Sequence, residues 1–195
     1  MKRNKPKYKQ IIDAAVIVIA ENGYHQAQVS KIAKQAGVAD GTIYLYFKNK
    51  EDILISLFRE KMGYFVEKNE EVIAGKSTAA EKLLVMIENH CRILTEDSHL
   101  AIVTQLELRQ SNKEIRLKIN EVLKGYLQLV DEILYYGIET NEFDPDLDVR
   151  LTRQMIFGTL DEMVTTWVMN DQKYDLVAQS PAIHQLLING CGGKR

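Results

Sequence analysis

Cysteine, proline and long apolar runs are scarce in this sequence. Its 195 residues include two cysteines and three prolines, and no run of eighteen apolar residues occurs, so we expect no membrane-spanning helix. The basic stretch 1–10 is not followed by the apolar segment and cleavage site of a secretion signal, which favours a cytoplasmic location. Cys91 and Cys191 lack C-x-x-C spacing, so a zinc or redox site is not expected, and Cys91 is predicted to be buried.

Motifs that would indicate an enzyme are missing as well. The sequence has no G-x-S-x-G elbow, P-loop or dinucleotide fingerprint. His25, His90 and His184 show no metal-ligand spacing, and the single Glu96-x-x-His99 lacks the second copy that a di-iron helical bundle requires. We therefore expect no catalytic residues, no metal and no cofactor.

Charge is distributed unevenly along the chain. Residues 1–50 hold nine Lys and Arg against three Asp and Glu, a net charge of +6; because the whole chain carries -2, the remainder carries -8. Clustered positive charge is favoured where a protein neutralises phosphates. The asymmetry indicates a polyanion bound near the N-terminus.

The hydrophobic pattern predicts an all-α protein of about nine helices. Apolar residues recur at helical spacing from Tyr8 to Ile19, and we expect this helix to end near Asn22-Gly23. A short helix around 32–36 and another beginning at Asp40, with its carboxylate as the cap, come next. Asn49 is the expected N-cap of a long helix reaching about 74–75, with Asp52 in capping-box position.

Later segments continue the helical pattern. Helices are predicted at 83–94, 100–108, 115–138, 149–169 and 183–188, with a loop at 141–146. No alternating strand pattern with turn signals competes with them.

The segment 32–50 has the proportions of a helix-turn-helix, in which the second helix enters the major groove. Ile43 and Phe47 are expected to point inward. The outward residues have separate predicted roles: close backbone approach for Gly41, base-edge or phosphate contact for Thr42, thymine-methyl contact for Leu45, and phosphate contacts for Tyr44, Tyr46 and Lys50. The alternative is that the two tyrosines only close the edge of a small core.

Together, residues 32–50 (IAKQAGVADGTIYLYFKNK) resemble the N-terminal signature of the TetR family of bacterial transcriptional repressors, and the match extends from Ile11 through the fourth helix. The resemblance implies an all-α homodimer with a DNA-binding head at 1–50, a connecting helix at about 50–74, and a ligand-binding and dimerisation body at 51–195. Where the family often has a Ser or Thr cap, this chain has Gln28. Ser30 and Lys31 are the expected substitutes for that phosphate contact.

Segments of the body, 104–112, 153–159 and 166–170, resemble the acyl-CoA-responsive regulators of fatty-acid degradation found in bacilli. That resemblance implies a repressor of fatty-acid metabolism genes that binds an inverted-repeat operator as a homodimer. A long-chain acyl-CoA is the implied inducing ligand, and no membrane partner is expected.

Five body residues are candidate ligand contacts. Arg109, near Gln105, is expected to face a pocket and pair with a carboxylate or phosphate, the alternative being an ion pair with Glu107 or Asp161. Arg92 and Arg116 are further phosphate candidates. Trp167 either lines the pocket or packs in the core.

Helix 149–169 carries small residues beside apolar ones, which together with the last helix predicts a dimer interface. These residues are Ile156, Gly158, Thr159, Leu160, Met163 and Val164. The alternative is a wholly intramolecular stripe. Two other functions stay open: a repressor of an efflux pump that senses hydrophobic drugs, and a helical lipid carrier without DNA function.

Overall fold

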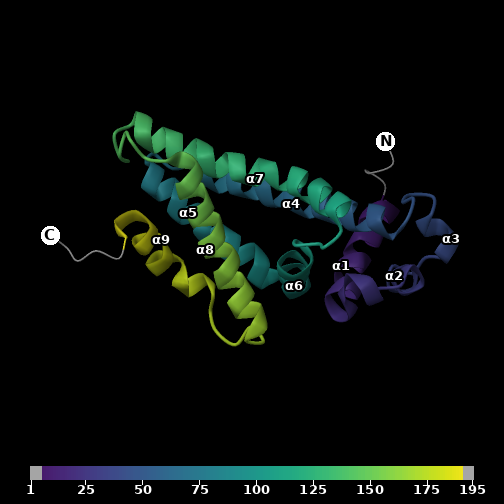
Figure 1. The fold of residues 1–195 in the computed structure, drawn as a ribbon. Coiled ribbons are helices and arrows are strands. Elements are labelled where there is room, and N and C mark those ends of the chain that lie inside the picture. The colour runs from purple at the N-terminus through teal and green to yellow at the C-terminus, as the bar shows by residue number, and fades with distance from the viewer. Residues whose placement is uncertain (1–5, 191–195) are drawn as a thin grey trace. The chain divides into compact units, whose positions relative to one another are not determined.

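The computed structural model describes residues 6–190, which form nine α-helices and no strand (Figure 1). The helices are α1 (Pro6–Gln26), α2 (Val29–Gln35), α3 (Asp40–Ile43), α4 (Lys50–Ala74), α5 (Ala79–Glu96), α6 (Ser98–Glu107), α7 (Lys113–Glu139), α8 (Val149–Met169) and α9 (Ser180–Asn189), with a 3₁₀ turn η1 (Val177–Gln179) before α9. The all-α prediction is confirmed. None of the described helices is long and apolar enough to cross a membrane.

The chain folds as two compact units. Unit 1 comprises residues up to 62 together with 97–122, and contains α1, α2, α3, α6 and the first parts of α4 and α7. Unit 2 comprises 63–96 together with residues from 123 onward, and contains α5, α8, α9 and the remainders of α4 and α7.

The core of unit 1 forms around α1, which packs against both α2 and α6. Ile43 and Phe47 are buried, as their spacing predicted, and the Phe47 ring stacks on Tyr8 with centroids 5.1 Å apart. Apolar burial of this kind stabilises the fold in proportion to the area removed from water. The inward side of the short helices is therefore fixed by α1.

Two helix boundaries differ from the sequence prediction. Gly23 adopts φ 71° as a left-handed stop would require, but the helix resumes for a further turn to Gln26, so the expected end is a kink. Asp40 does not cap α3: Ala39, with extended backbone, occupies the N-cap position, and Asp40 is the first helical residue.

The start of α4 follows the capping prediction closely. Asn49 Oδ1 accepts a hydrogen bond of 2.8 Å from the backbone N–H of Asp52. The Asp52 carboxylate accepts in turn from the N–H of Lys48 at 2.9 Å, one residue before the donor expected in a capping box. These bonds fix where the short α3 segment ends and the long helix begins.

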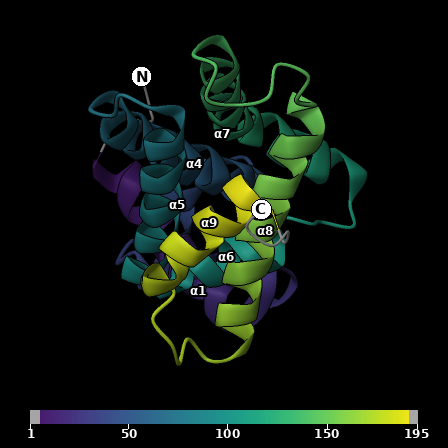
Figure 2. The same cartoon turned by 90° about the vertical axis from the view of Figure 1, so that its left-hand side faces the viewer.

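In unit 2, α9 packs against α5, and Figure 2 shows α9 crossing the view between α5 and α8. Asp148 caps α8 by accepting from the N–H of Leu151 at 2.9 Å, so α8 begins where predicted. The last helix begins earlier than predicted, with Pro181 inside its first turn. Proline is tolerated there because the first N–H groups of a helix have no intrahelical partner.

Part of the predicted dimer stripe is intramolecular. Ile156, Leu160 and Val164 are buried in the core of unit 2, because they lie on the side of α8 that packs against the rest of the unit. Gly158 on the same helix is exposed, and no atom lies within 4 Å of where its Cβ would stand.

Candidate DNA-binding surface and ligand contacts

Residues 40–47, which comprise α3 and the turn after it and are here called the α3 segment, have an exposed outer surface, as the helix-turn-helix prediction requires. Gly41 is exposed with open space around its Cβ position, and Thr42 is half-buried. α3 itself is only one turn long; Leu45 and Tyr46 follow it in a turn closed by hydrogen bonds from their N–H groups to Thr42 and Ile43. The segment thus presents its outward side chains from a hydrogen-bonded turn.

Tyr44 and Leu45 are the most exposed large side chains of this surface, at 59% and 65%. Such exposure is inconsistent with a role for Tyr44 in closing the core. Tyr46 is half-buried, and its ring lies 6.5 Å from that of Phe47, so it covers one edge of the core while its position stays partly open to solvent. The two tyrosines therefore differ in environment.

Lys50 has an internal role that the sequence did not reveal. Its Nζ donates hydrogen bonds of 3.0 Å to the carbonyl oxygens of both Tyr24 and His25, and it lies 4.7 Å from the centroid of the Tyr24 ring. The last carbonyls of a helix lack intrahelical donors, so a cation there stabilises the helix end. Burial, followed by the charges of Glu51 and Glu107, raises the pKa of the Tyr24 hydroxyl.

Ser30 and Lys31 are both exposed in the first turn of α2. Gln28 occupies the N-cap position and makes no capping hydrogen bond with its side chain. Lys31 Nζ donates to Asn22 Oδ1 at 2.8 Å, which connects the start of α2 to the kinked end of α1.

Glu107 on α6 connects α1 to the segment that follows α6. Its Oε1 accepts from the backbone N–H of Tyr24 at 2.7 Å, and its Oε2 accepts from Gln110 Nε2 at 2.5 Å. Arg116 Nη1 donates to the carbonyls of Gln110 and Ser111 at 2.9 and 3.1 Å. Each oxygen of the Glu107 carboxylate thus accepts a hydrogen bond. Sequence reasoning missed this role, because Glu107 and Tyr24 are 83 residues apart.

The five candidate ligand contacts divide between the units. Gln105, Arg109 and Arg116 belong to unit 1, whereas Arg92 and Trp167 belong to unit 2. Arg109 and Arg92 are exposed and Gln105 is buried. Trp167 is buried, and its Nε1–H donates to the Tyr174 carbonyl at 2.8 Å, an arrangement that matches the core-packing alternative.

Unit 2 also buries a polar pair that the sequence did not single out. His90 Nδ1 lies 2.9 Å from the hydroxyl oxygen of Tyr126, and Phe65 meets both rings edge to face at 5.0 and 5.5 Å. Burial lowers the pKa of His90 to about 4 and raises that of Tyr126 above its usual range. Both groups are therefore neutral at pH 7.

Cys91, next to His90, is buried as predicted, and burial raises the pKa of its thiol. Cys191 and the basic residues Lys2, Arg3 and Lys5 lie outside the described residues. Between residues 6 and 190, no group of three His, Cys, Asp or Glu side chains is close enough to hold a metal ion.

Comparison with known proteins connects both units to one family. Residues 11–57 match the profile of bacterial regulatory proteins of the tetR family, and residues 58–190 match that of the C-terminal region of YsiA-like proteins. The chain is 70% identical over 194 residues to the fatty acid metabolism regulator protein of Bacillus subtilis (strain 168), with 100% of each chain covered. The protein belongs to the tetR family of bacterial regulatory proteins. The expectation of a DNA-binding regulator, not an enzyme, is confirmed.

Solved structures of tetR-family relatives share the fold closely. The transcriptional regulator FadR from Bacillus subtilis, in complex with stearoyl-CoA, is 70% identical with a TM-score of 0.93. The fatty acid degradation regulator FadR from Bacillus halodurans is 65% identical with a TM-score of 0.93. Each similarity covers 95% of this chain and 100% of the other. The similarity to the bacillar regulators of fatty-acid degradation thus extends over the body as well as the head.

Proposed function

We propose that the protein represses transcription of fatty-acid metabolism genes and is released from its operator by a long-chain acyl-CoA. The observation that carries this function is the 70% identity, over the full length, to the fatty acid metabolism regulator of Bacillus subtilis. The stearoyl-CoA bound to FadR of that species supports the ligand class. The protein acts in the cytoplasm, where both DNA and acyl-CoA are present.

The DNA-binding head consists of residues 1–50 and the ligand-binding and dimerisation body of 51–195, with α4 connecting them. In the head, Gly41, Thr42 and Leu45 approach base edges, a role supported by the exposure of Gly41 and Leu45 and by the partly open position of Thr42. The remaining contacts, Ser30, Lys31, Tyr44, Tyr46 and Lys50, address phosphates and so position the head without reading sequence. Lys50 holds the end of α1 with two hydrogen bonds and has a further N–H for a phosphate.

The candidate phosphate contacts are Arg109 and Arg116 of unit 1 and Arg92 of unit 2, because a guanidinium group can bind phosphate in a bidentate manner. The exposed positions of Arg109 and Arg92 support this role. Gln105, buried in unit 1, and Trp167, buried in unit 2, are the remaining candidate ligand contacts.

The regulator functions as a homodimer that places two heads on an inverted repeat. Exposed apolar side chains on α8 and α9 support a self-complementary surface, namely Leu151, Met155, Leu186 and Ile188. Gly158 of α8 has open space at its Cβ position, which permits close approach of a second helix.

A mobility-shift experiment with a promoter fragment containing the inverted repeat tests this function. We expect salt-sensitive retardation that stearoyl-CoA reverses and that free coenzyme A, the control, does not. Release of this kind requires a coupling free energy of about 1–3 kcal/mol between the two sites. Release by a cationic hydrophobic drug instead would favour the efflux-pump repressor, and binding without sequence preference or salt dependence would favour the lipid carrier.

Arg109→Ala tests the ligand contact separately. The variant should bind the operator like the unaltered protein but require a higher stearoyl-CoA concentration for release. An unchanged release curve would remove Arg109 from the ligand contacts.

A further inference from the structure

One ring nitrogen of His90 on α5 is buried and makes no hydrogen bond to the described residues. Its exposed fraction is 7%, its Nδ1 pairs with the Tyr126 hydroxyl at 2.9 Å, and its Nε2 is buried without a hydrogen-bond partner. The rings of Phe65 and Tyr126 lie 5.0 and 5.6 Å from the imidazole. Two aromatic rings thus flank the buried imidazole, and an unsatisfied polar atom at such a buried position is unfavourable unless something binds it.

The hydrogen-bond balance of the pair decides which nitrogen carries the proton. If Nδ1–H donated to Tyr126, the tyrosine hydroxyl would in turn need an acceptor, and between residues 6 and 190 its only hydrogen-bond partner is His90. If the hydroxyl donates to Nδ1, only one group stays unsatisfied. The second arrangement leaves fewer orphaned atoms, so Nε2 bears the hydrogen and is a buried donor that needs an acceptor.

The acceptor that fits this donor is uncharged. Burial lowers the pKa of His90, which means that a charged group at this position loses hydration that its surroundings do not replace. A carboxylate or phosphate placed against a single neutral N–H in apolar surroundings would lose far more hydration than it regained. A carbonyl oxygen attached to an apolar chain meets both requirements.

We infer that His90 reads the thioester carbonyl of the inducing acyl-CoA by donating a hydrogen bond from Nε2, with Tyr126 as the positioning residue that holds the imidazole in the required tautomer. This inference rests on the proposed function. Phe65 and Phe157, whose rings lie 5.5 and 6.3 Å from that of Tyr126, supply apolar surface for the first carbons of the chain. His90 thereby distinguishes an acyl thioester from an alkyl chain of equal length.

The test compares stearoyl-CoA with S-octadecyl-CoA, a thioether of the same chain length without the carbonyl oxygen. The measurement is the concentration of each compound that releases half of the protein from operator DNA. For the unaltered protein we expect the thioether to require about tenfold more, the effect of one buried hydrogen bond. His90→Phe should abolish the difference between the two compounds, whereas His90→Gln, which keeps an N–H donor near the Nε2 position, should restore part of it.

Two further variants complete the experiment. Tyr126→Phe should reduce the discrimination, because the imidazole then has no donor to hold its tautomer. His184→Phe is the matched control: this histidine is also in unit 2, but its Nε2 already pairs with the Ala80 carbonyl at 2.9 Å, so discrimination should be unchanged. Thermal unfolding of each apo variant reports whether the substitution disturbs the core.

The outcomes separate this inference from the proposed function. Equal release of the unaltered protein by both compounds would overturn the role of His90 and leave acyl-CoA regulation intact. Retained discrimination in His90→Phe would also overturn it, since another group would then read the carbonyl. If neither compound released the operator, the proposed function and the inference would fall together.

Discussion

In unit 1, Tyr44 and Leu45 expose more than half of their largely apolar side chains, whereas in unit 2 the atoms Asn89 Nδ2 and His90 Nε2 are buried with no hydrogen-bond partner among the described residues. Ordinary folding does the reverse, because apolar groups are favoured inside and polar groups in water. The exposed pair belongs to the segment proposed to meet DNA, and the buried atoms belong to the body proposed to bind ligand. The exposed apolar side chains are therefore available to the proposed DNA partner. The buried polar atoms lie inside the unit, where an acyl chain would bind.

The two units also differ in whether their polar side-chain groups are hydrogen-bonded. Glu107 accepts from two N–H donors, and Lys50 donates to two carbonyls at the end of α1. The five buried side-chain atoms found without a partner in the described part of the chain all lie in unit 2: on Asn69, Asn89, His90, Asp131 and Ser180. Hydrogen bonds thus fix these groups of unit 1, whereas the five atoms in unit 2 retain unused bonding capacity.

The largest expected effect comes from exchanging an inward residue of the α3 segment for alanine. Phe47→Ala removes a buried ring stacked on Tyr8, so the free energy of unfolding should fall by about 3–5 kcal/mol. Urea unfolding measures the loss, and operator binding should disappear with it. Leu45→Ala is the matched outward change: stability should stay within about 0.5 kcal/mol while operator affinity falls. A strongly destabilised Leu45→Ala would refute the division into inward and outward residues.

The second largest effect concerns the buried His90 and is measured as the dependence of stability on pH. The pKa of His90 is lowered to about 4 in the folded protein, against about 6.5 in the unfolded chain. The unfolded state therefore binds more protons between these values, so stability falls as pH decreases from about 6.5 to 4, by about 3 kcal/mol in total. His90→Phe lacks this titration. The difference between the two unfolding curves against pH should show it, and parallel curves would contradict burial of a neutral imidazole.

The elements of the fold were predictable because their signals are local. Apolar spacing and the Asn49 boundary placed the helix-turn-helix, and the inward positions of Ile43 and Phe47 followed from their separation of about one helical turn. The predicted N-cap, Asp40, was wrong by one residue, because Ala39, with its extended backbone, occupies the cap position.

The contacts that matter for ligand response were not predictable in the same way. His90 pairs with a tyrosine 36 residues away, and Glu107 pairs with a backbone group 83 residues away. Neither partner is specified by helical periodicity, since packing between distant helices brings them together. His90 lies beside Cys91 in the sequence, and only the fold reveals that its ring is buried among aromatic side chains.

A smaller effect separates the internal role of Lys50 from its proposed phosphate contact. Lys50→Met should reduce the free energy of unfolding by about 1–2 kcal/mol, because two carbonyls of α1 lose a charged donor. If Lys50 also contacts a phosphate, the slope of log K against log salt for operator binding should decrease by about 0.9. An unchanged slope would leave only the internal role.

Thr42→Ala provides the contrast to Lys50→Met on the DNA side. It should alter the preference among operator sequences with little change in the salt slope, because a base-edge contact carries sequence information and a phosphate contact does not. Equal losses on operator and random DNA from both variants would contradict the separate roles of Thr42 and Lys50.

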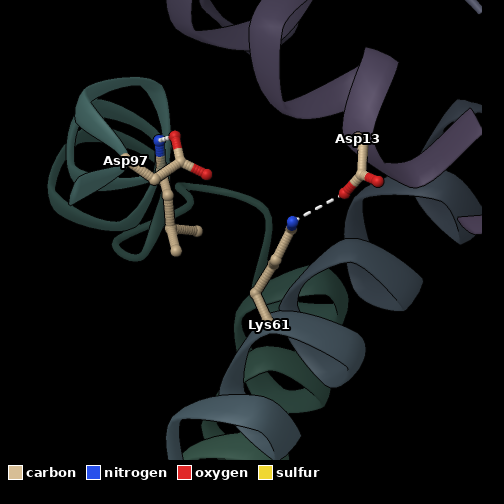
Figure 3. A network of polar contacts seen from close by, with 4 residues as sticks. Asp13, Lys61 and Asp97 are labelled. Atoms are coloured by element: carbon tan, nitrogen blue, oxygen red, sulfur yellow. Dashed lines mark hydrogen bonds and ion pairs between the residues drawn. The ribbon is translucent and has the colours of Figure 1, made fainter. Parts of the chain in front are cut away.

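The smallest expected effect concerns an exposed ion pair of unit 1. Lys61 Nζ lies 2.7 Å from the Asp13 carboxylate, between α4 and α1, while nearby Asp97 caps α6 by accepting from Leu100 (Figure 3). The Asp13 side chain is 63% exposed, so water and salt screen the pair. Asp13→Asn should therefore lower the free energy of unfolding by at most about 0.5 kcal/mol, and less in high salt. Asp97→Ala, which removes a helix cap in the same unit, should cost about 1 kcal/mol in urea unfolding. A larger loss of stability for Asp13→Asn than for Asp97→Ala would contradict this expectation. Surface charge would then stabilise unit 1 more than hydrogen bonds to its backbone do, and the contrast between hydrogen-bonded groups in unit 1 and unpaired buried atoms in unit 2 would no longer hold.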